Sequence, residues 1–294
     1  MTVGSAPVMA DRVRIAPDTT VGPVHLTVAD LERSLNYYTG AIGMRVRERA
    51  GKVARLGSEG HELLVLYEEP GARPVQGHTG LFHLALLLPA RADLARWLHH
   101  AVDAGVGLGG MSDHLVSEAL YLRDPDGHGI EIYRDRPREQ WPREGDGVGM
   151  ASLPLDPADL LRAADGGAGA GYDGLPAGTR MGHVHLHVAD VPETEAFYRD
   201  VLGFDVMAHL GDQATFLSAG GYHHHIGANV WAGQGATPPP PGSAALRYAT
   251  IVLPDAAERH RVAARVADAG GEVVELDGGA LVHDPARNAL LLTA

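Results

Sequence analysis

The sequence predicts an α+β protein of four βαβββ modules, whose curved antiparallel sheets form two half-barrels with helices on their outer faces. Two internal repeats support this prediction. The segment 24–30 recurs at 184–190, and the two copies stay aligned without a gap through Tyr38 and Tyr198. Between these copies, the pattern of segment 86–105 recurs at 251–270. Together, the two repeats give four modules in one chain.

Each element of a module has its own signal in the sequence. A first strand is followed by an amphipathic helix that begins after an Asp, at 31–38 and again at 191–198, and a Gly ends each helix. In the intervening units, Asp-Pro turns at Asp124 and Asp284 precede the last strand. The four modules are therefore expected at 20–68, 79–135, 181–232 and 244–294.

The connections divide the chain into two pairs of modules, at 20–137 and 179–294. The linker 138–178 is rich in Gly, Ala, Pro and Asp, and one short helix is expected to begin near Asp156. Ala168–Gly171 has the composition of a flexible linker. Met1–Pro23 lacks the zones of a signal peptide and is expected to form a loose tail.

Composition excludes several classes of function. With 24 Lys and Arg against 37 Asp and Glu, the net charge is −13, which argues against binding to nucleic acid or an anionic membrane. No apolar run approaches the ~20 residues of a membrane span, so a cytoplasmic protein is expected. The sequence is compatible with a homo-oligomer. The chain has no Cys but 17 His. Any metal must therefore be bound by imidazole and carboxylate groups.

Several motifs resemble the vicinal oxygen chelate superfamily, which includes glyoxalases, bleomycin-resistance proteins and extradiol ring-cleavage dioxygenases. They are the paired modules, Phe197–Phe204 after Asp190, and the turn Asp124–Glu131. Two further segments, 114–122 and 221–227, resemble the catechol 2,3-dioxygenases that carry four modules in one chain. The resemblance covers nearly the whole chain outside the tail and the linker. It implies the glyoxalase-like fold and an enzyme that cleaves a small aromatic diol with O2.

In this superfamily, each module offers a metal ligand from its first strand and another from its last. The first module has Pro23 at the first of these positions, and the fourth has Tyr248 and Leu291. The resemblance leaves three ligands, two imidazoles and one carboxylate, which suit non-haem Fe(II), with Mn(II) as the alternative; they are His83, Glu131 and His183. Because these ligands belong to the second and third modules, we expect these two modules to share one sheet.

The resemblance also implies residues for proton transfer and orientation. His114 corresponds to the histidine that stabilises bound dioxygen, and Tyr121 to the tyrosine that hydrogen-bonds a substrate oxygen. An acid/base histidine is expected in segment 223–226, where the motif favours His224 but strand alternation favours His225. His185 has a counterpart in His25, which follows closely after Pro23, a residue that cannot bind metal. This correspondence favours a structural role for His185.

The sequence leaves two alternatives to an Fe(II)-dependent extradiol dioxygenase acting on catechol or a simple substituted catechol. A metal-dependent isomerase or lyase of glyoxalase type needs a second carboxylate, and Gly227 stands where that acid would lie. A metal-free, drug-sequestering protein would lose the histidine and glutamate set that this chain retains. The sequence therefore favours the dioxygenase.

Overall fold

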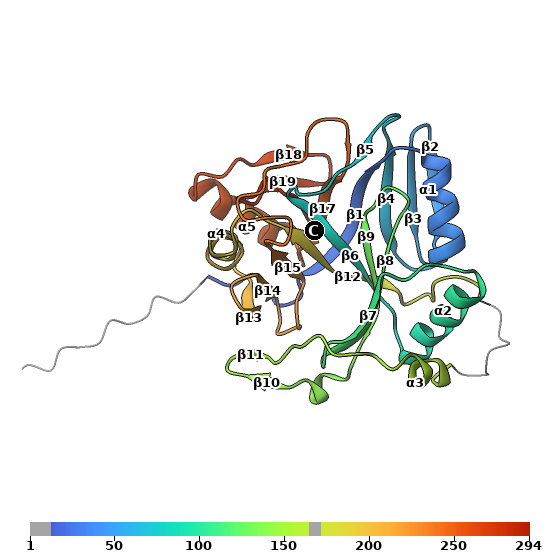
Figure 1. The fold of residues 1–294 in the computed structure, drawn as a ribbon. Coiled ribbons are helices and arrows are strands. Elements are labelled where there is room, and N and C mark those ends of the chain that lie inside the picture. Colours follow the sequence, from blue (N-terminus) through green and yellow to red (C-terminus); the bar gives the residue numbers. More distant parts are fainter. Residues whose placement is uncertain (1–12, 165–171) are drawn as a thin grey trace, which may run out of the picture.

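The computed structural model describes residues 13–164 and 172–294, which fold around two eight-stranded sheets (Figure 1). In spatial order, the first sheet contains β18 (Val274–Leu276), β19 (Gly279–His283), β20 (Ala289–Thr293), β17 (Leu246–Val252), β1 (Thr20–Val28), β4 (Glu62–Glu68), β3 (Val53–Gly57) and β2 (Arg45–Ala50). The second contains β13 (Asp205–Leu210), β14 (Ala214–Ser218), β15 (Ile226–Asn229), β12 (Arg180–His187), β6 (Gly80–Leu87), β9 (Gly129–Asp135), β8 (Ser117–Arg123) and β7 (Gly110–Asp113).

This strand order confirms that the second and third modules share a sheet, while the first and fourth form the other. Each half of the chain therefore contributes one module to each sheet. The sheets are mixed rather than antiparallel as expected, because the first strand of each module lies parallel to the last strand of that module. The first strands β6 and β12 pair antiparallel at the centre of the second sheet.

Two small ribbons complete the β structure. One joins β10 (Arg143–Glu144) to β11 (Gly147–Val148), and the other joins β5 (Arg73–Pro74) to β16 (Ser243–Ala244). The ribbon β10–β11 belongs to the segment that was predicted only as a linker.

Helices cover the outer faces of the sheets (Figure 1). The long ones are α2 (Arg91–Asp103) and α5 (Ala256–Asp268), and the short ones are α1 (Leu31–Tyr37), α4 (Val191–Ala196) and the 3-10 turn η2 (Arg138–Gln140). Helix α3 (Pro157–Arg162) begins where predicted, since the Asp156 carboxylate accepts from the backbone N–H groups of Ala158 and Asp159. The flexible segment predicted at 168–171 lies outside the described residues.

The first helix of each half ends differently from the prediction. Helices α1 and α4 pass into π-helical turns, η1 (Tyr38–Ile42) and η3 (Phe197–Leu202), before Gly43 and Gly203 end them with positive φ values of 86° and 93°. Tyr38 and Tyr198 begin these turns or lie within them, and both are fully buried. Their hydroxyls donate to the carboxylates of Asp124 and Asp284 respectively, so each turn is tied to the next module.

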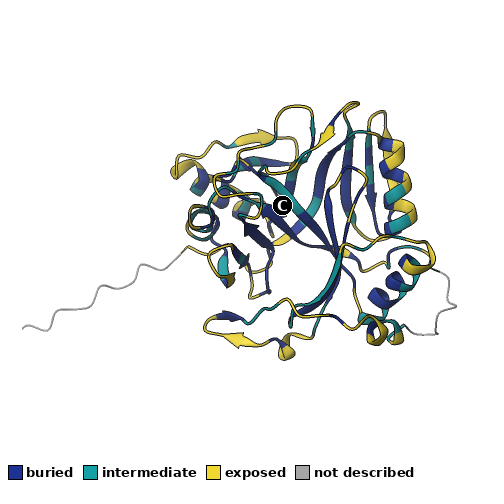
Figure 2. Ribbon diagram, viewed as in Figure 1, coloured by how far each residue is buried: buried dark blue, intermediate teal, exposed yellow. Residues whose placement is uncertain are grey.

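Among the described residues, one large and two small clusters of buried hydrophobic side chains form the core, and Figure 2 shows that the buried residues follow the strands and one side of the helices. The large cluster includes Ile15, whose backbone N–H donates to the carbonyl of Gly203. The prediction of a loose tail up to Pro23 is therefore wrong for its last part, because Ile15 is buried and strand β1 begins at Thr20. The segment before residue 13 lies outside the described residues. Among the described helices, none is long and apolar enough to cross a membrane.

Candidate metal centre

The register of the second sheet brings three residues of ligand type to one place. Ala85 on β6 lies opposite Glu131 on β9 and opposite His183 on β12. Side chains at directly paired positions share a face of the sheet, and His83 shares it too because it lies two residues before Ala85. Because the side chain of Ala85 is small, it does not separate the side chains of Glu131 and His183 on either side of it.

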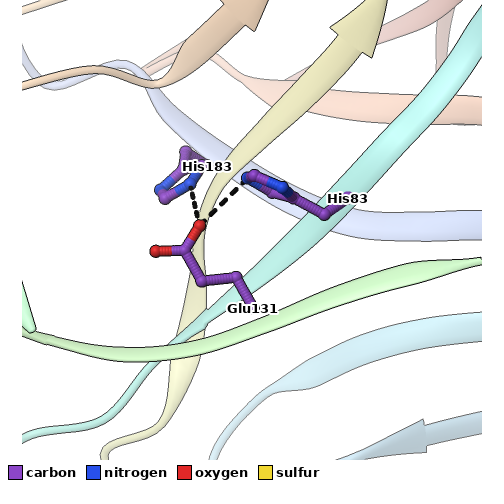
Figure 3. A group of neighbouring side chains, drawn as sticks. All are labelled: His83, Glu131 and His183. Carbon is purple, nitrogen blue, oxygen red and sulfur yellow. Dashed lines mark hydrogen bonds and ion pairs between the residues drawn. The ribbon is translucent and has the colours of Figure 1, made fainter. Parts of the chain in front are cut away.

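The three side chains converge closely (Figure 3). Glu131 Oε2 lies 3.0 Å from His83 Nε2 and 3.1 Å from His183 Nε2. One ligand atom from each of the three residues lies within 4.8 Å of the other two. All three residues are buried. The structure thus brings together His83, Glu131 and His183, the three residues that the sequence predicts as ligands.

The electrostatics of this cluster favour the forms that bind metals. Burial works to raise the pKa of Glu131, but His183, through charge and a hydrogen bond, and then the proximity of His83 lower this pKa well below its usual range. Burial lowers the pKa of His183 to about 4, although Glu131 opposes this change. At neutral pH the cluster therefore combines a carboxylate with a neutral imidazole at His183, as metal binding requires.

A divalent metal fits this donor set. His83 Nε2 is buried close to Glu131 Oε2 but lacks hydrogen-bond geometry, so within the described residues it has no hydrogen-bond partner. A buried polar atom without a partner is costly, and coordination would remove this cost. Two imidazole nitrogens and one carboxylate oxygen are the facial set of non-haem iron sites. The donors are therefore suited to Fe(II) or Mn(II).

A cavity of about 490 Å³ lies over this cluster. His83, Glu131 and His185 contribute to its wall, while the remaining lining is largely aromatic, aliphatic or uncharged. Its apolar side chains come from separate elements of the fold and include Phe82, Met150, Leu210, Phe216 and Trp231. Among the described residues that line the cavity, none is Arg or Lys. The cavity therefore suits a flat, apolar ligand without a fixed negative charge.

Tyr121 and His114 lie together on one side of this cavity. Tyr121 is paired with Glu131 between β8 and β9, and its hydroxyl lies 2.7 Å from His114 Nε2. His114 Nδ1 lies 2.7 Å from the carbonyl of Ala151, which only accepts, so Nδ1 donates and Nε2 accepts from Tyr121. Burial and then the charge of Glu131 raise the pKa of Tyr121 well above its usual range, which keeps this donor protonated.

His224 and His225 point to different places. His224 lines the cavity beside His183, with 4.0 Å between their ring centroids. His225 lines a separate cavity, and its Nδ1 lies 3.2 Å from both the hydroxyl of Ser218 and the backbone N of Ala219. The alternation argument that favoured His225 does not apply, because strand β15 begins only at Ile226. Burial, and next the proximity of His183, lowers the pKa of His224 well below its usual range.

The cavity wall also contains residues for which the sequence predicted a structural role, as for His185, or no role at all. His185 is paired with His83 across the two central strands, and its ring centroid lies 5.0 Å from that of His83. A Cβ added at Gly227 would lie 2.8 Å from the His185 ring, so this ring occupies the space that a side chain at position 227 would need. Alternation of histidines along β12 signalled that His185 shares a face with His183. No comparable signal marked Met150–Ser152, which reach the cavity from the linker.

Comparisons with known proteins agree with this architecture. The model of the Glyoxalase/Bleomycin resistance protein/Dioxygenase superfamily matches residues 20–132 and 180–278. A protein of Bacillus subtilis (strain 168) named catechol-2,3-dioxygenase is 44% identical over 282 residues, which cover 94% of this chain and 98% of the relative.

Solved structures share the fold at lower identity. A candidate dioxygenase from Bacillus subtilis is 14% identical with a TM-score of 0.65, and the alignment covers 95% of this chain and 86% of that one. Glyoxalase I from Zea mays is 16% identical with a TM-score of 0.55, with 94% of this chain and 92% of that chain covered. These likenesses concern the fold alone.

Proposed function

The chain belongs to the Glyoxalase/Bleomycin resistance protein/Dioxygenase superfamily, and from this premise we propose that it is an Fe(II)-dependent extradiol dioxygenase that cleaves catechols with O2. One observation carries the proposal: two histidines and one glutamate converge at a cavity with largely apolar walls. The 44% identity to a protein named catechol-2,3-dioxygenase supports the same reaction.

His83, Glu131 and His183 would hold the metal. Fe(II), when bound, would supply a template on which a catechol and O2 meet and a conduit for electrons between them. Three protein ligands leave coordination positions free for both reactants. The cavity residues then have three tasks, which are to orient the ring, to exclude water and to move protons.

His224 would take a proton from a catechol hydroxyl. It is the histidine beside His183 that lines the cavity, and burial favours its neutral form, which accepts a proton. Tyr121 would orient the substrate near Glu131 by accepting from a substrate hydroxyl, because its own proton is donated to His114. His114 would stabilise bound dioxygen after its Nε2 gains a proton, which would reverse the hydrogen bond to Tyr121. Because Tyr121 donates to His114, these two residues would act as a pair.

The cavity also restricts the substrate class. Its apolar walls favour an aromatic ring, and no Arg or Lys among the described lining residues is available to pair with a carboxylate. Burying an unpaired carboxylate costs far more than burying a methyl group. We therefore expect catechol and catechols with small apolar substituents to be preferred over acidic catechols.

The glyoxalase alternative receives less support. Gly227 stands where the second carboxylate of such a site would lie, and the His185 ring occupies the space beside it. A proton shuttle between two carboxylates is therefore not built into this sheet. Manganese(II) remains the alternative metal, since the same donors bind it.

The test is a direct assay. Protein purified without oxygen is loaded with Fe(II) or Mn(II), its metal content is measured, and catechol is added in air-saturated buffer. We expect a yellow ring-cleavage product and the consumption of equimolar O2 and catechol. Stoichiometric metal binding without O2 consumption for catechol or methylcatechols would refute the dioxygenase proposal. A parallel assay with the hemithioacetal of methylglyoxal and glutathione tests the isomerase.

A further inference from the structure

Behind His224, a chain of buried polar groups leads away from the cavity. His224 Nδ1 lies 2.8 Å from Nδ1 of His223, and His223 Nε2 lies 2.9 Å from Oδ1 of Asp135. His223 is fully buried, and Asp135 is the last residue of β9, the strand that carries Glu131. The chain therefore connects the candidate acid/base residue to a carboxylate on a rigid strand.

The hydrogen-bonding capacity of these groups fixes the position of each proton. A carboxylate only accepts, so His223 Nε2 carries the proton that faces Asp135. In neutral His223, Nδ1 then has a lone pair and must accept, so His224 Nδ1 carries the proton between the two rings. Neutral His224 is left with an unprotonated Nε2. This nitrogen has no hydrogen-bond partner among the described residues, while His224 lines the cavity.

We propose that Asp135 and His223 are positioning residues that hold His224 as the Nδ1–H tautomer, with the lone pair of Nε2 available to the substrate. The inference rests on the proposed function only for the use of that lone pair. In that use, a catechol O–H bond breaks and an N–H bond forms at His224 Nε2. The resulting imidazolium keeps its Nδ1–H hydrogen bond to His223, whose other nitrogen donates to the Asp135 carboxylate.

Aromatic neighbours hold the ring of His223, the middle member of the chain, in place. His223 lies against Tyr222, with 4.1 Å between ring centroids, and Trp141 lies at 5.3 Å. The hydroxyl of Tyr222 also donates to Asp135 Oδ1, at 3.1 Å, and lies 2.7 Å from the hydroxyl of Tyr133. Asp135 thus accepts from two aromatic side chains. The hydrogen bond from His223 is the one that leads to His224.

Three variants separate this role from a merely structural one. His223→Phe keeps an aromatic ring in the cluster but removes both hydrogen bonds. Asp135→Asn keeps the shape but introduces a donor, which allows His223 and then His224 to adopt the opposite tautomer. Tyr222→Phe is the matched control, because it removes a hydrogen bond to Asp135 and leaves the connection to His224 intact.

The decisive measurement is the tautomer of His224, read from the ¹⁵N shifts of histidine-labelled protein without substrate. The signal is assigned by comparison with His224→Gln. We expect protonated Nδ1 and unprotonated Nε2 in the wild type and in Tyr222→Phe, and a mixed or reversed state in the other two variants. An Nε2–H tautomer in the wild type would overturn the proposal. So would a His224 signal that is unchanged in both His223→Phe and Asp135→Asn.

Kinetics with Fe(II) and catechol provide the second readout. We expect kcat to fall about 10- to 100-fold in His223→Phe and Asp135→Asn, the range for residues that orient a working histidine, with KM and iron content near wild type. An equal loss of kcat in Tyr222→Phe would indicate that the packing around His223 had loosened, and it would count against a positioning role for Asp135 and His223. Absence of ring cleavage by the wild type would instead refute the dioxygenase proposal, while the tautomer measurement would still decide the positioning role.

Discussion

The hydroxyl of Tyr121 donates to Nε2 of His114 across 2.7 Å, and this bond joins strand β8 to the loop that follows β7. His114 is held from its other side by the carbonyl of Ala151, so its ring orientation is fixed at both nitrogens. Tyr121 in turn is paired with Glu131. The pair therefore links Glu131, a proposed metal ligand, to the linker segment that lines the cavity.

Replacing Tyr121 with Phe should lower kcat for catechol by roughly 10- to 100-fold, which corresponds to one lost hydrogen bond to a charged or polarised partner. Iron content should stay at the wild-type level, because the hydroxyl is not among the ligands. Steady-state O2 uptake and metal analysis measure both effects. A variant with unchanged kcat would show that Tyr121 does not orient the substrate.

Replacing one of the proposed metal ligands should abolish metal binding while the fold stays intact. Glu131→Gln loses the only carboxylate of the cluster, and His83→Ala loses one of its two imidazoles. We expect each to weaken Fe(II) or Mn(II) binding by more than about 100-fold, since even residues that only support a ligand cost 10- to 100-fold. Titration calorimetry with Mn(II) measures this directly. His260→Ala, on the exposed side of α5, is the control and should bind metal like the wild type.

The two adjacent histidines should behave differently. His224→Ala should lower kcat by roughly 100- to 10,000-fold, the usual contribution of a general base, and should retain iron. His225→Ala changes a residue of the separate cavity and should lower kcat much less. Comparing kcat and iron content in the two variants distinguishes them. The reverse order of defects would identify His225 as the base.

Charge at the cavity should control substrate choice. Because no Arg or Lys is present among the described lining residues, 3-methylcatechol should have a kcat/KM at least about 10-fold above that of 3,4-dihydroxybenzoate. Leu210 lines the cavity and is 53% exposed, so Leu210→Arg can add a cation without disturbing the core. Leu210→Arg should reduce the difference in kcat/KM between the two substrates, whereas Leu210→Gln should not. Equal narrowing by both substitutions would argue against a charge effect.

Stability should change with pH through Asp284. Burial raises the pKa of Asp284 to about 6, although hydrogen bonds from Asn288 and Tyr198 oppose the rise. Since the folded state holds this proton more tightly than the unfolded chain, the contribution of Asp284 to stability is fully present below about pH 4. It is lost as the pH rises through about 6. The loss amounts to about 3 kcal/mol at most.

Urea unfolding between pH 4 and 7 tests this sign. Buried histidines such as His183 make the folded state more stable as the pH rises over the same interval, so the comparison between variants is decisive. The free energy of unfolding of the wild type should decrease relative to that of Asp284→Asn between pH 4 and 7, whereas its difference from Asp277→Asn, at an exposed position, should stay constant. A pH profile that is the same in wild type and Asp284→Asn would contradict the assignment.

The sequence was most informative where the repeats could be compared position by position. Pro23, Tyr248 and Leu291 marked the modules that lack ligands, and the pairing of the second and third modules followed from them. The structure brings His83, Glu131 and His183 together in that pairing. These residues lie on paired strands of one sheet, where the register determines which side chains meet.

Prediction was weaker where the backbone is irregular. The alternation rule was applied to segment 223–226, but positive φ values at Gly220 and Gly221 and the late start of β15 remove the period of two that the rule needs. The linker was also interpreted from its composition alone. Composition did not indicate that the Ala151 carbonyl would hold His114, because such contacts depend on tertiary folding.

The antiparallel pairing of β6 with β12 has a consequence for how the protein reaches its active form. His83 and His183 come from opposite halves of the chain, so neither half alone can chelate the ion with all three groups. Bringing these strands together closes a loop of about one hundred residues, which is a slow, entropically costly step in folding. If the proposed site binds its metal, binding would follow that step, and the ion would then hold the two halves together. Chelators should consequently accelerate unfolding of the mature protein without changing its rate of collapse.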